Sequence, residues 1–178
     1  MSYKMSAAIS FLFFLCLFLV FYTYIGYGII LWIAVKVKER FMPPKKPGLP
    51  EILPEVTLFI SAYNEEKVID AKMENCFLID YPEDKLKIYW VTDGSSDRTN
   101  EILAEYPDVT VLFQPERRGK TAAINRGMKS VKTPVVVFTD ANTMINKGAV
   151  KEIVKAFTDP RTGCVAGEKR IAVKEKDT

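Results

Sequence analysis

The chain has 178 residues, of which 48% are hydrophobic, and 25 basic residues nearly balance 22 acidic ones. It contains no histidine, which excludes histidine-ligated metals and every catalytic relay that pairs a nucleophile with histidine. The three cysteines, Cys16, Cys76 and Cys164, are odd in number and widely spaced, which argues against a disulfide framework or a zinc site.

The first element in chain order is an apolar segment, residues 7–35, that contains no charged residue. A membrane-spanning helix needs about 20 such residues. Tyrosines and a tryptophan gather toward the end of the segment, as they do at membrane interfaces. The segment is longer than the apolar region of about 7 to 15 residues in a cleaved signal peptide. We therefore predict a short tail, residues 1–6, and a transmembrane helix, residues 7–35; a buried core helix is the alternative.

The charges on the two sides of this segment differ. Only Lys4 precedes it. The basic residues that follow it are Lys36, Lys38, Arg40, Lys45 and Lys46. The positive-inside rule therefore predicts a membrane protein whose chain after residue 35 lies in the cytoplasm. Residues 36–54 are basic and rich in proline, which is typical of a linker. The domain after the linker is predicted to be residues 55–178. From Lys36 onward the chain holds 24 basic and 22 acidic residues, and this balance argues against nucleic acid as a partner.

Beyond the linker, apolar runs of strand length alternate with helix-length segments. The predicted strands are residues 56–62, 87–92, 109–113, 135–139 and 163–166. The predicted helices are residues 65–77, 97–106, 120–131 and 147–157. This alternation predicts an α/β fold with right-handed crossovers and a mainly parallel sheet that has helices on both faces. Ligands of such folds bind at the carboxyl ends of the strands.

Two carboxylates follow directly on predicted strands, so they should meet at that edge. Asp93 ends one apolar run and Asp140 another. A carboxylate in this position can bind a ribose, a base edge or a metal-bound phosphate. In the loop after Asp93, the expected role of Ser96 or Asp97 is to cap the next helix.

Two other loops reach the same edge. Lys120 starts a predicted helix directly after Gly119, and a helix N-terminus favours anions such as a diphosphate. Lys120 fits such a site or a plain surface charge, whereas arginines in this position are more often solvated. In the loop after the first strand, Asn64 is placed to cap a helix, and the ring of Tyr63 is placed to stack on a nucleobase.

Taken in order, these loops resemble the motifs of glycosyltransferase family 2, the inverting nucleotide-sugar transferases of GT-A (Rossmann-like) fold. Ser61-Ala-Tyr-Asn-Glu-Glu66 is similar to the family's first-strand motif, and Val91-Thr-Asp-Gly-Ser-Ser-Asp-Arg-Thr99 to its Asp-Gly-Ser loop. Arg118-Gly-Lys-Thr-Ala-Ala-Ile-Asn125 is similar to its Gly-Lys segment. Asp140-Ala-Asn142 falls where the family carries Asp-x-Asp. The resemblance covers about residues 56–170.

The resemblance implies a nucleotide-sugar site. The residues it assigns to the donor are Ala62, Tyr63, Glu65, Asp93, Lys120 and Asp140. Among them, Asp93 would bond the uracil or ribose and Lys120 would lie near the sugar or diphosphate. A divalent metal, Mn²⁺ or Mg²⁺, would bind at Asp140 and Asn142 and bridge the diphosphate. An amide at position 142 is an uncharged and weaker ligand than the family's second aspartate, so metal binding should be weakened.

The resemblance also implies a reaction. We expect transfer, with inversion, of a sugar from a nucleotide-sugar, a UDP-sugar above all, to a lipid-linked or polysaccharide acceptor. This chain would supply the donor-binding half, and the family's carboxylate base, acceptor-site motif and further membrane helices are expected beyond Thr178 or in a partner chain. A non-catalytic, membrane-tethered module that binds nucleotide-sugars is the alternative. A sugar nucleotidyltransferase fits less well, since its glycine-rich loop after the first strand is lacking.

Overall fold

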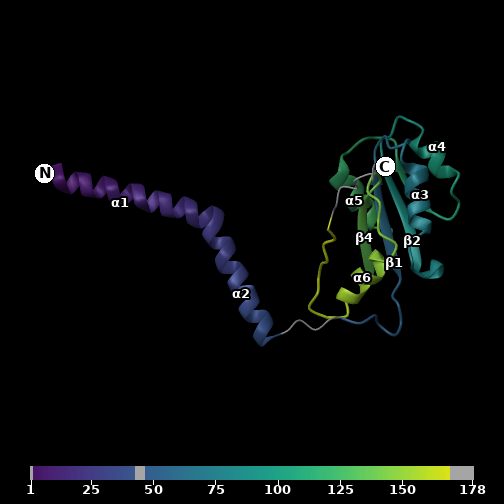
Figure 1. The fold of residues 1–178 in the computed structure, drawn as a ribbon. Coiled ribbons are helices and arrows are strands. Elements are labelled where there is room, and N and C mark those ends of the chain that lie inside the picture. Colours follow the sequence, from purple (N-terminus) through teal and green to yellow (C-terminus); the bar gives the residue numbers. More distant parts are fainter. Residues whose placement is uncertain (1, 43–46, 169–178) are drawn as a thin grey trace, which may run out of the picture. The chain divides into compact units, whose positions relative to one another are not determined.

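The computed structural model describes residues 2–42 and 47–168 (Figure 1). The chain divides into two compact units, Met1–Lys46 and Pro47–Thr178. The first unit is helical and the second combines strands with helices. Of the basic residues predicted to follow the apolar segment, Lys45 and Lys46 lie outside the described residues.

The N-terminal unit consists of α1 (Ser2–Phe21), the π-helix η1 (Tyr22–Gly26) and α2 (Tyr27–Phe41). Its segment Ser6–Phe41 has 36 residues and is long and apolar enough to cross a membrane. The helix axis bends between α1 and α2 (Figure 1), as expected where a π-helical turn interrupts an α-helix. Helix α2 continues six residues past the predicted boundary at residue 35, because no proline occurs before residue 43.

The second unit is built on a parallel sheet. Its strands are β1 (Val56–Ala62), β2 (Leu86–Asp93), β3 (Thr110–Gln114) and β4 (Val135–Asp140). They lie in the order β3-β2-β1-β4, and every neighbouring pair is parallel. The predicted parallel sheet is therefore confirmed. Because β4 returns to the opposite side of β1 from β2, a crevice opens at the carboxyl ends of β1 and β4, where ligands of such sheets bind.

Helices cover both faces of this sheet, as the alternation predicted. They are α3 (Ile69–Phe77), α4 (Thr99–Ala104), α5 (Lys120–Met128) and α6 (Ala149–Ala156). The larger core cluster joins α3, α4 and α6 to one face. The smaller cluster joins α5 to the other face through Phe59, Val91 and Ala123. Figure 1 shows α5 on the opposite side of the strands from α3 and α4.

Helix α5 lies unusually close to the sheet because it carries a glycine at the contact. A Cβ atom added to Gly127 would lie 2.6 Å from Phe59 Cζ and 2.6 Å from Val91 Cγ2. Any side chain there would force the helix away from β1 and β2. Gly127 thus sets the distance at which α5 presents its N-terminus, Gly119 and Lys120, to the carboxyl edge of the sheet.

Two predicted elements differ clearly from the structure. Helix α3 begins at Ile69 instead of residue 65, because residues 65–68 form a turn whose backbone is bonded by a distant loop: the Glu65 N–H donates to Thr99 Oγ1 at 2.9 Å. The strand predicted at residues 163–166 is also wrong, since residues 162–168 form neither strand nor helix. This short apolar run lies between Gly163 and Gly167, and glycine weakens a strand.

Candidate functional site

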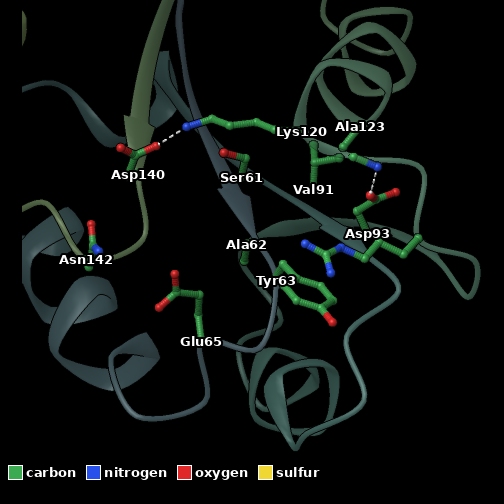
Figure 2. Close-up of a pocket in the computed structure, with 12 residues that line it drawn as sticks. Ser61, Ala62, Tyr63, Glu65, Val91, Asp93, Lys120, Ala123, Asp140 and Asn142 are labelled. Atoms are coloured by element: carbon green, nitrogen blue, oxygen red, sulfur yellow. Dashed lines mark hydrogen bonds and ion pairs between the residues drawn. The ribbon is translucent and has the colours of Figure 1, made fainter.

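A pocket of about 330 Å³ lies at the carboxyl ends of β1, β2 and β4 (Figure 2). It is lined by all seven residues that the sequence singled out: Ala62, Tyr63, Glu65, Asp93, Lys120, Asp140 and Asn142. Their registers explain the gathering, because Ser61 of β1 pairs with Asp140 of β4, and Ala62 pairs with Thr92 of β2. Ser61, Val91, Arg117, Gly119 and Ala123 line the pocket as well and were not assigned to it from the sequence.

Asp93 forms a buried acceptor at one end of the pocket. Its side chain is only 5% exposed, and Oδ2 accepts hydrogen bonds from the backbone N–H groups of Arg118, at 2.9 Å, and Gly119, at 2.6 Å. Among the described residues, its second oxygen, Oδ1, is buried without a hydrogen-bond partner. A buried acceptor left unpaired costs about 1–3 kcal/mol, so a donor group of a ligand would be strongly favoured there.

Gly94 fixes the loop that follows Asp93. Its φ is +70°, and an added Cβ would lie 2.6 Å from the backbone nitrogen of Arg117. The Gly94 N–H donates to the carbonyl of Gln114 at 2.9 Å. The loops after β2 and β3 are thereby held in direct backbone contact, which places the two amides that bond Asp93.

The loop after β1 is tied to the loop after β2. Asn64 does not cap α3, as was predicted; it adopts φ +54°, and its Oδ1 accepts a hydrogen bond from the Ser96 N–H at 2.8 Å. Of the two predicted caps of α4, only Asp97 bonds that helix, accepting from the Thr99 N–H at 3.0 Å. Burial alone raises the pKa of Asp97, but hydrogen bonds from Thr99 and Glu66 outweigh this and hold the pKa below its usual value.

Tyr63 and Arg117 stack on each other at the same end of the pocket. The Arg117 guanidinium carbon lies 3.9 Å from the centroid of the Tyr63 ring, in cation–π geometry. Tyr63 remains 39% exposed. Arg117 is exposed, as expected of the arginines before Gly119, and it also lines the pocket. A planar base entering here would meet an aromatic ring and a guanidinium beside the buried carboxylate of Asp93.

The other end of the pocket carries an exposed ion pair. Lys120 Nζ lies 2.5 Å from Asp140 Oδ1, and the two side chains are 62% and 46% exposed (Figure 2). Such pairs contribute at most about 1 kcal/mol, so a ligand can separate them at little cost. Asn142 is exposed close by, and its Oδ1 accepts a hydrogen bond from Thr143 Oγ1 at 3.4 Å.

Lys72, which was not assigned to the site from the sequence, bonds the residues on either side of Asp140 and Asn142. Lys72 is fully buried, and its Nζ donates to Thr139 Oγ1 at 3.1 Å and to the Thr143 carbonyl. Burial lowers its pKa, whereas Cys76 and Asp140 act to raise it. Burial likewise raises the pKa of the Cys76 thiol to about 11. The signal in the sequence was a lysine on the apolar stripe of α3, beside Ile69, Met73 and Cys76.

The residues at this end fit a divalent cation only in part. Among residues 2–42 and 47–168, no three acidic, cysteine or histidine side chains form a group that could hold a metal. Asp140 and Asn142 offer one carboxylate and one amide oxygen. Mg²⁺ in nucleotide sites commonly takes one or two carboxylates and completes its shell with substrate phosphates and water. The pair therefore fits a cation that arrives with a diphosphate.

Comparison with known protein families gives a match over most of the chain. Residues 57–177 match the family model described as Glycosyl transferase family 2. The chain belongs to glycosyltransferase family 2. The family and the fold predicted from the four motifs are thus confirmed.

Curated relatives of this family 2 chain include two bacterial proteins. It is 32% identical over 137 residues to poly-beta-1,6-N-acetyl-D-glucosamine synthase of Staphylococcus aureus (strain COL), a match that covers 74% of this chain and 33% of that protein. It is 33% identical over 141 residues to the probable glycosyltransferase YdaM of Bacillus subtilis (strain 168), with 75% and 33% covered. The chain therefore spans about a third of the length of these relatives.

Two similar solved structures are complexes with a nucleotide or a nucleotide-sugar. The mannosyltransferase PcManGT from Pyrobaculum calidifontis, in complex with GDP-Man and Mn²⁺, is 30% identical with a TM-score of 0.69, over 85% of this chain and 46% of that one. TarS 1–349 of S. aureus in complex with UDP is 25% identical with a TM-score of 0.54, over 60% and 32%. The family 2 chain thus resembles proteins whose complexes include a nucleotide and, in PcManGT, a metal.

Proposed function

We propose that this chain forms the donor side of an inverting glycosyltransferase that takes a sugar from a nucleotide-sugar. The observation that carries the proposal is Asp93, a buried carboxylate with one oxygen held by two backbone amides and the other without a partner in the pocket wall. An acceptor buried in this way favours a ligand that offers an N–H group. Nucleobases offer such groups, and the neighbouring Tyr63 and Arg117 offer planar surfaces for stacking.

The donor we propose is a UDP-sugar. The N3–H of uracil would donate to Asp93 Oδ1, and the uracil ring would lie against Ala62 and Tyr63. The TarS complex with UDP supports this choice, whereas the GDP-Man complex of PcManGT makes guanine the competing base. Glu65, which lines the pocket between Ala62 and Asn142 (Figure 2), would accept hydrogen bonds from the ribose or the sugar.

The diphosphate would lie at the start of α5. Lys120 would leave Asp140 and pair with the phosphates, close to the N–H groups of the first helical turn. Asp140, with Asn142, would then be available to hold Mn²⁺ or Mg²⁺. The metal would supply charge neutralisation to the departing nucleoside diphosphate. The residues of the chain would orient the donor, and Lys120 would exchange its ion pair with Asp140 for one with the phosphates.

For the rest of the protein, we propose a membrane location. The segment Ser6–Phe41 would cross the bilayer, and the five cations after residue 35 would place the family 2 domain in the cytoplasm. The division into tail, span, linker and domain would follow residues 1–6, 7–35, 36–54 and 55–178. The acceptor would be a lipid-linked or growing polysaccharide, which the poly-beta-1,6-N-acetyl-D-glucosamine synthase relative supports.

Calorimetric titration of the full chain in detergent tests the donor assignment. UDP and GDP are each titrated with and without Mn²⁺ into the wild type, Asp93→Ala and the control Asp108→Ala, which removes an exposed carboxylate outside the pocket. We expect Asp93→Ala to weaken UDP binding by roughly 10- to 100-fold in both conditions, as loss of a charged hydrogen-bond partner does. The Asp108 variant should bind like the wild type. Absence of UDP and GDP binding by the wild type, or unchanged binding by Asp93→Ala, would refute the assignment.

A further inference from the structure

Helix α3 contacts the β4–α6 loop, in which we include the last two residues of β4, Thr139 and Asp140. Two polar side chains make these contacts, Lys72 and Asn75, which lie nearly one helical turn apart on α3. Neither lines the pocket. Their partners belong to the loop that carries Asp140 and Asn142 into it.

Lys72 bonds this loop on both sides of the pocket residues. Its ammonium donates to the Thr139 hydroxyl, one residue before Asp140, and to the Thr143 carbonyl, one residue after Asn142. The Lys72 side chain is completely buried. Burying an ammonium group is costly unless its hydrogen bonds are made, so any shift of residues 140–142 that broke them would be opposed.

Asn75 fixes the loop a few residues further along. Its Oδ1 accepts from the Ile145 N–H at 2.8 Å, and its Nδ2 donates to the Ile145 carbonyl at 2.8 Å. The amide thus bonds both backbone groups of one residue, as a neighbouring strand would. Together with Lys72, it holds the loop at Thr139, Thr143 and Ile145.

The charges near Asp140 explain why this support matters. Lys120 pairs with Asp140 across the pocket, Lys72 bonds the loop from below, and Asn142 contributes no charge. A second carboxylate would let a cation organise the loop by binding it, but one carboxylate and an amide attract a cation less strongly. The loop must therefore take its shape from the protein before the cation arrives.

We propose that Lys72 and Asn75 are positioning residues that hold Asp140 and Asn142 in the conformation that receives the metal-bound diphosphate. The proposal rests on the proposed function, since it concerns the phosphate end of the same donor site. Neither side chain lines the pocket; Lys72 acts through the Thr139 hydroxyl and the Thr143 carbonyl, and Asn75 through the backbone of Ile145. Their loss should weaken the contribution of the metal to nucleotide binding and spare the contribution of Asp93.

The test measures UDP binding by the full chain in detergent with and without Mn²⁺, together with thermal unfolding. Lys72→Met keeps the length of the side chain and removes its charge and donors. Asn75→Asp keeps the acceptor for the Ile145 N–H and removes the donor to its carbonyl. The matched control is Tyr81→Phe, which removes a buried donor to the Pro54 carbonyl at 2.6 Å, outside the pocket.

We expect Lys72→Met to reduce the Mn²⁺-dependent gain in UDP affinity by at least about fivefold, and Asn75→Asp by roughly twofold to fivefold. The metal-free dissociation constant should stay within about twofold of the wild type in both, a split that a general loss of folding would not produce. If Lys72→Met does not fold, Asn75→Asp gives the same readout. Retention of the full Mn²⁺ gain by the variants that fold, or a wild type that binds UDP equally with and without Mn²⁺, would overturn the proposal. Failure of the wild type to bind either UDP or GDP would instead refute the donor assignment.

Discussion

The two ends of the pocket are built in different ways. At the base end, formed by Tyr63, Asp93 and Arg117, the carboxylate is buried and held by backbone amides. At the phosphate end, formed by Lys120, Asp140 and Asn142, the first two side chains form an exposed ion pair, and the buried Lys72 bonds the same loop. Backbone partners cannot move far without unfolding a loop, whereas exposed ion pairs exchange readily. On the proposed donor assignment, the base end would thus be preformed, whereas the phosphate end would rearrange when its ligand binds.

The largest effect on stability should come from a substitution at Gly94, which fixes the loop at the base end. Gly94→Ala places a Cβ atom 2.6 Å from the Arg117 backbone nitrogen at φ +70°. We expect the free energy of unfolding to fall by roughly 2–4 kcal/mol, from overpacking and left-handed strain together. Urea unfolding followed by tryptophan fluorescence measures it. Gly148→Ala is the control, because an added Cβ there has no atom within 4 Å; equal losses in both variants would contradict a preformed base end.

Removing the Asp140 carboxylate should weaken metal-dependent nucleotide binding and leave metal-free binding intact. Asp140→Ala should lower the Mn²⁺-dependent gain in UDP affinity by about tenfold, since one charged ligand is lost. Metal-free UDP binding should be unchanged or slightly stronger, because Lys120 no longer has this partner. Titration calorimetry with and without Mn²⁺ gives both values. A large loss of metal-free affinity would mean that Asp140 belongs to the base end.

Lys120 should have opposite effects on the two ligands. Lys120→Met removes the cation proposed for the diphosphate and the present partner of Asp140. We expect UDP to bind about threefold to tenfold more weakly without metal, and Mn²⁺ alone to bind a few-fold more tightly. Mn²⁺ binding is followed by electron paramagnetic resonance. Lys129→Met, an exposed lysine at the other end of α5, is the matched control and should change neither value.

The smallest effect should come from Asn142. Asn142→Asp adds the second carboxylate of the family motif, and the half-saturating Mn²⁺ concentration in the presence of UDP should fall about threefold. The gain stays small because Lys72 and Lys120 already offset charge around this loop. An unchanged Mn²⁺ requirement would show that the cation does not contact residue 142.

The sequence predicted the strands better than the loops that join them. Residues 56–62 and 135–139 are mostly apolar and of strand length, and β1 and β4 match them within one residue. The loops depend on partners that are distant in the chain: Asn64 bonds Ser96, 32 residues away, and so cannot be assigned from its neighbours. The role of Lys72 was not identified from the sequence for the same reason, because its partners are 67 and 71 residues away. The hydrophobic periodicity of a segment indicates which of its faces is buried, but not which polar groups of distant segments that face contacts.

The strand order also determines at what point during synthesis and folding the pocket can form. β1 pairs with β2 on one side and with β4, almost 80 residues later in the chain, on the other. During synthesis from the N-terminus, β1, β2 and β3 emerge first, and the crevice beside β1 closes only when β4 docks. Asp93 and the amides that bond it are therefore synthesised before Asp140. A nucleotide bound across both would recognise only the completed sheet, and it would slow the loss of β4 more than that of any other strand.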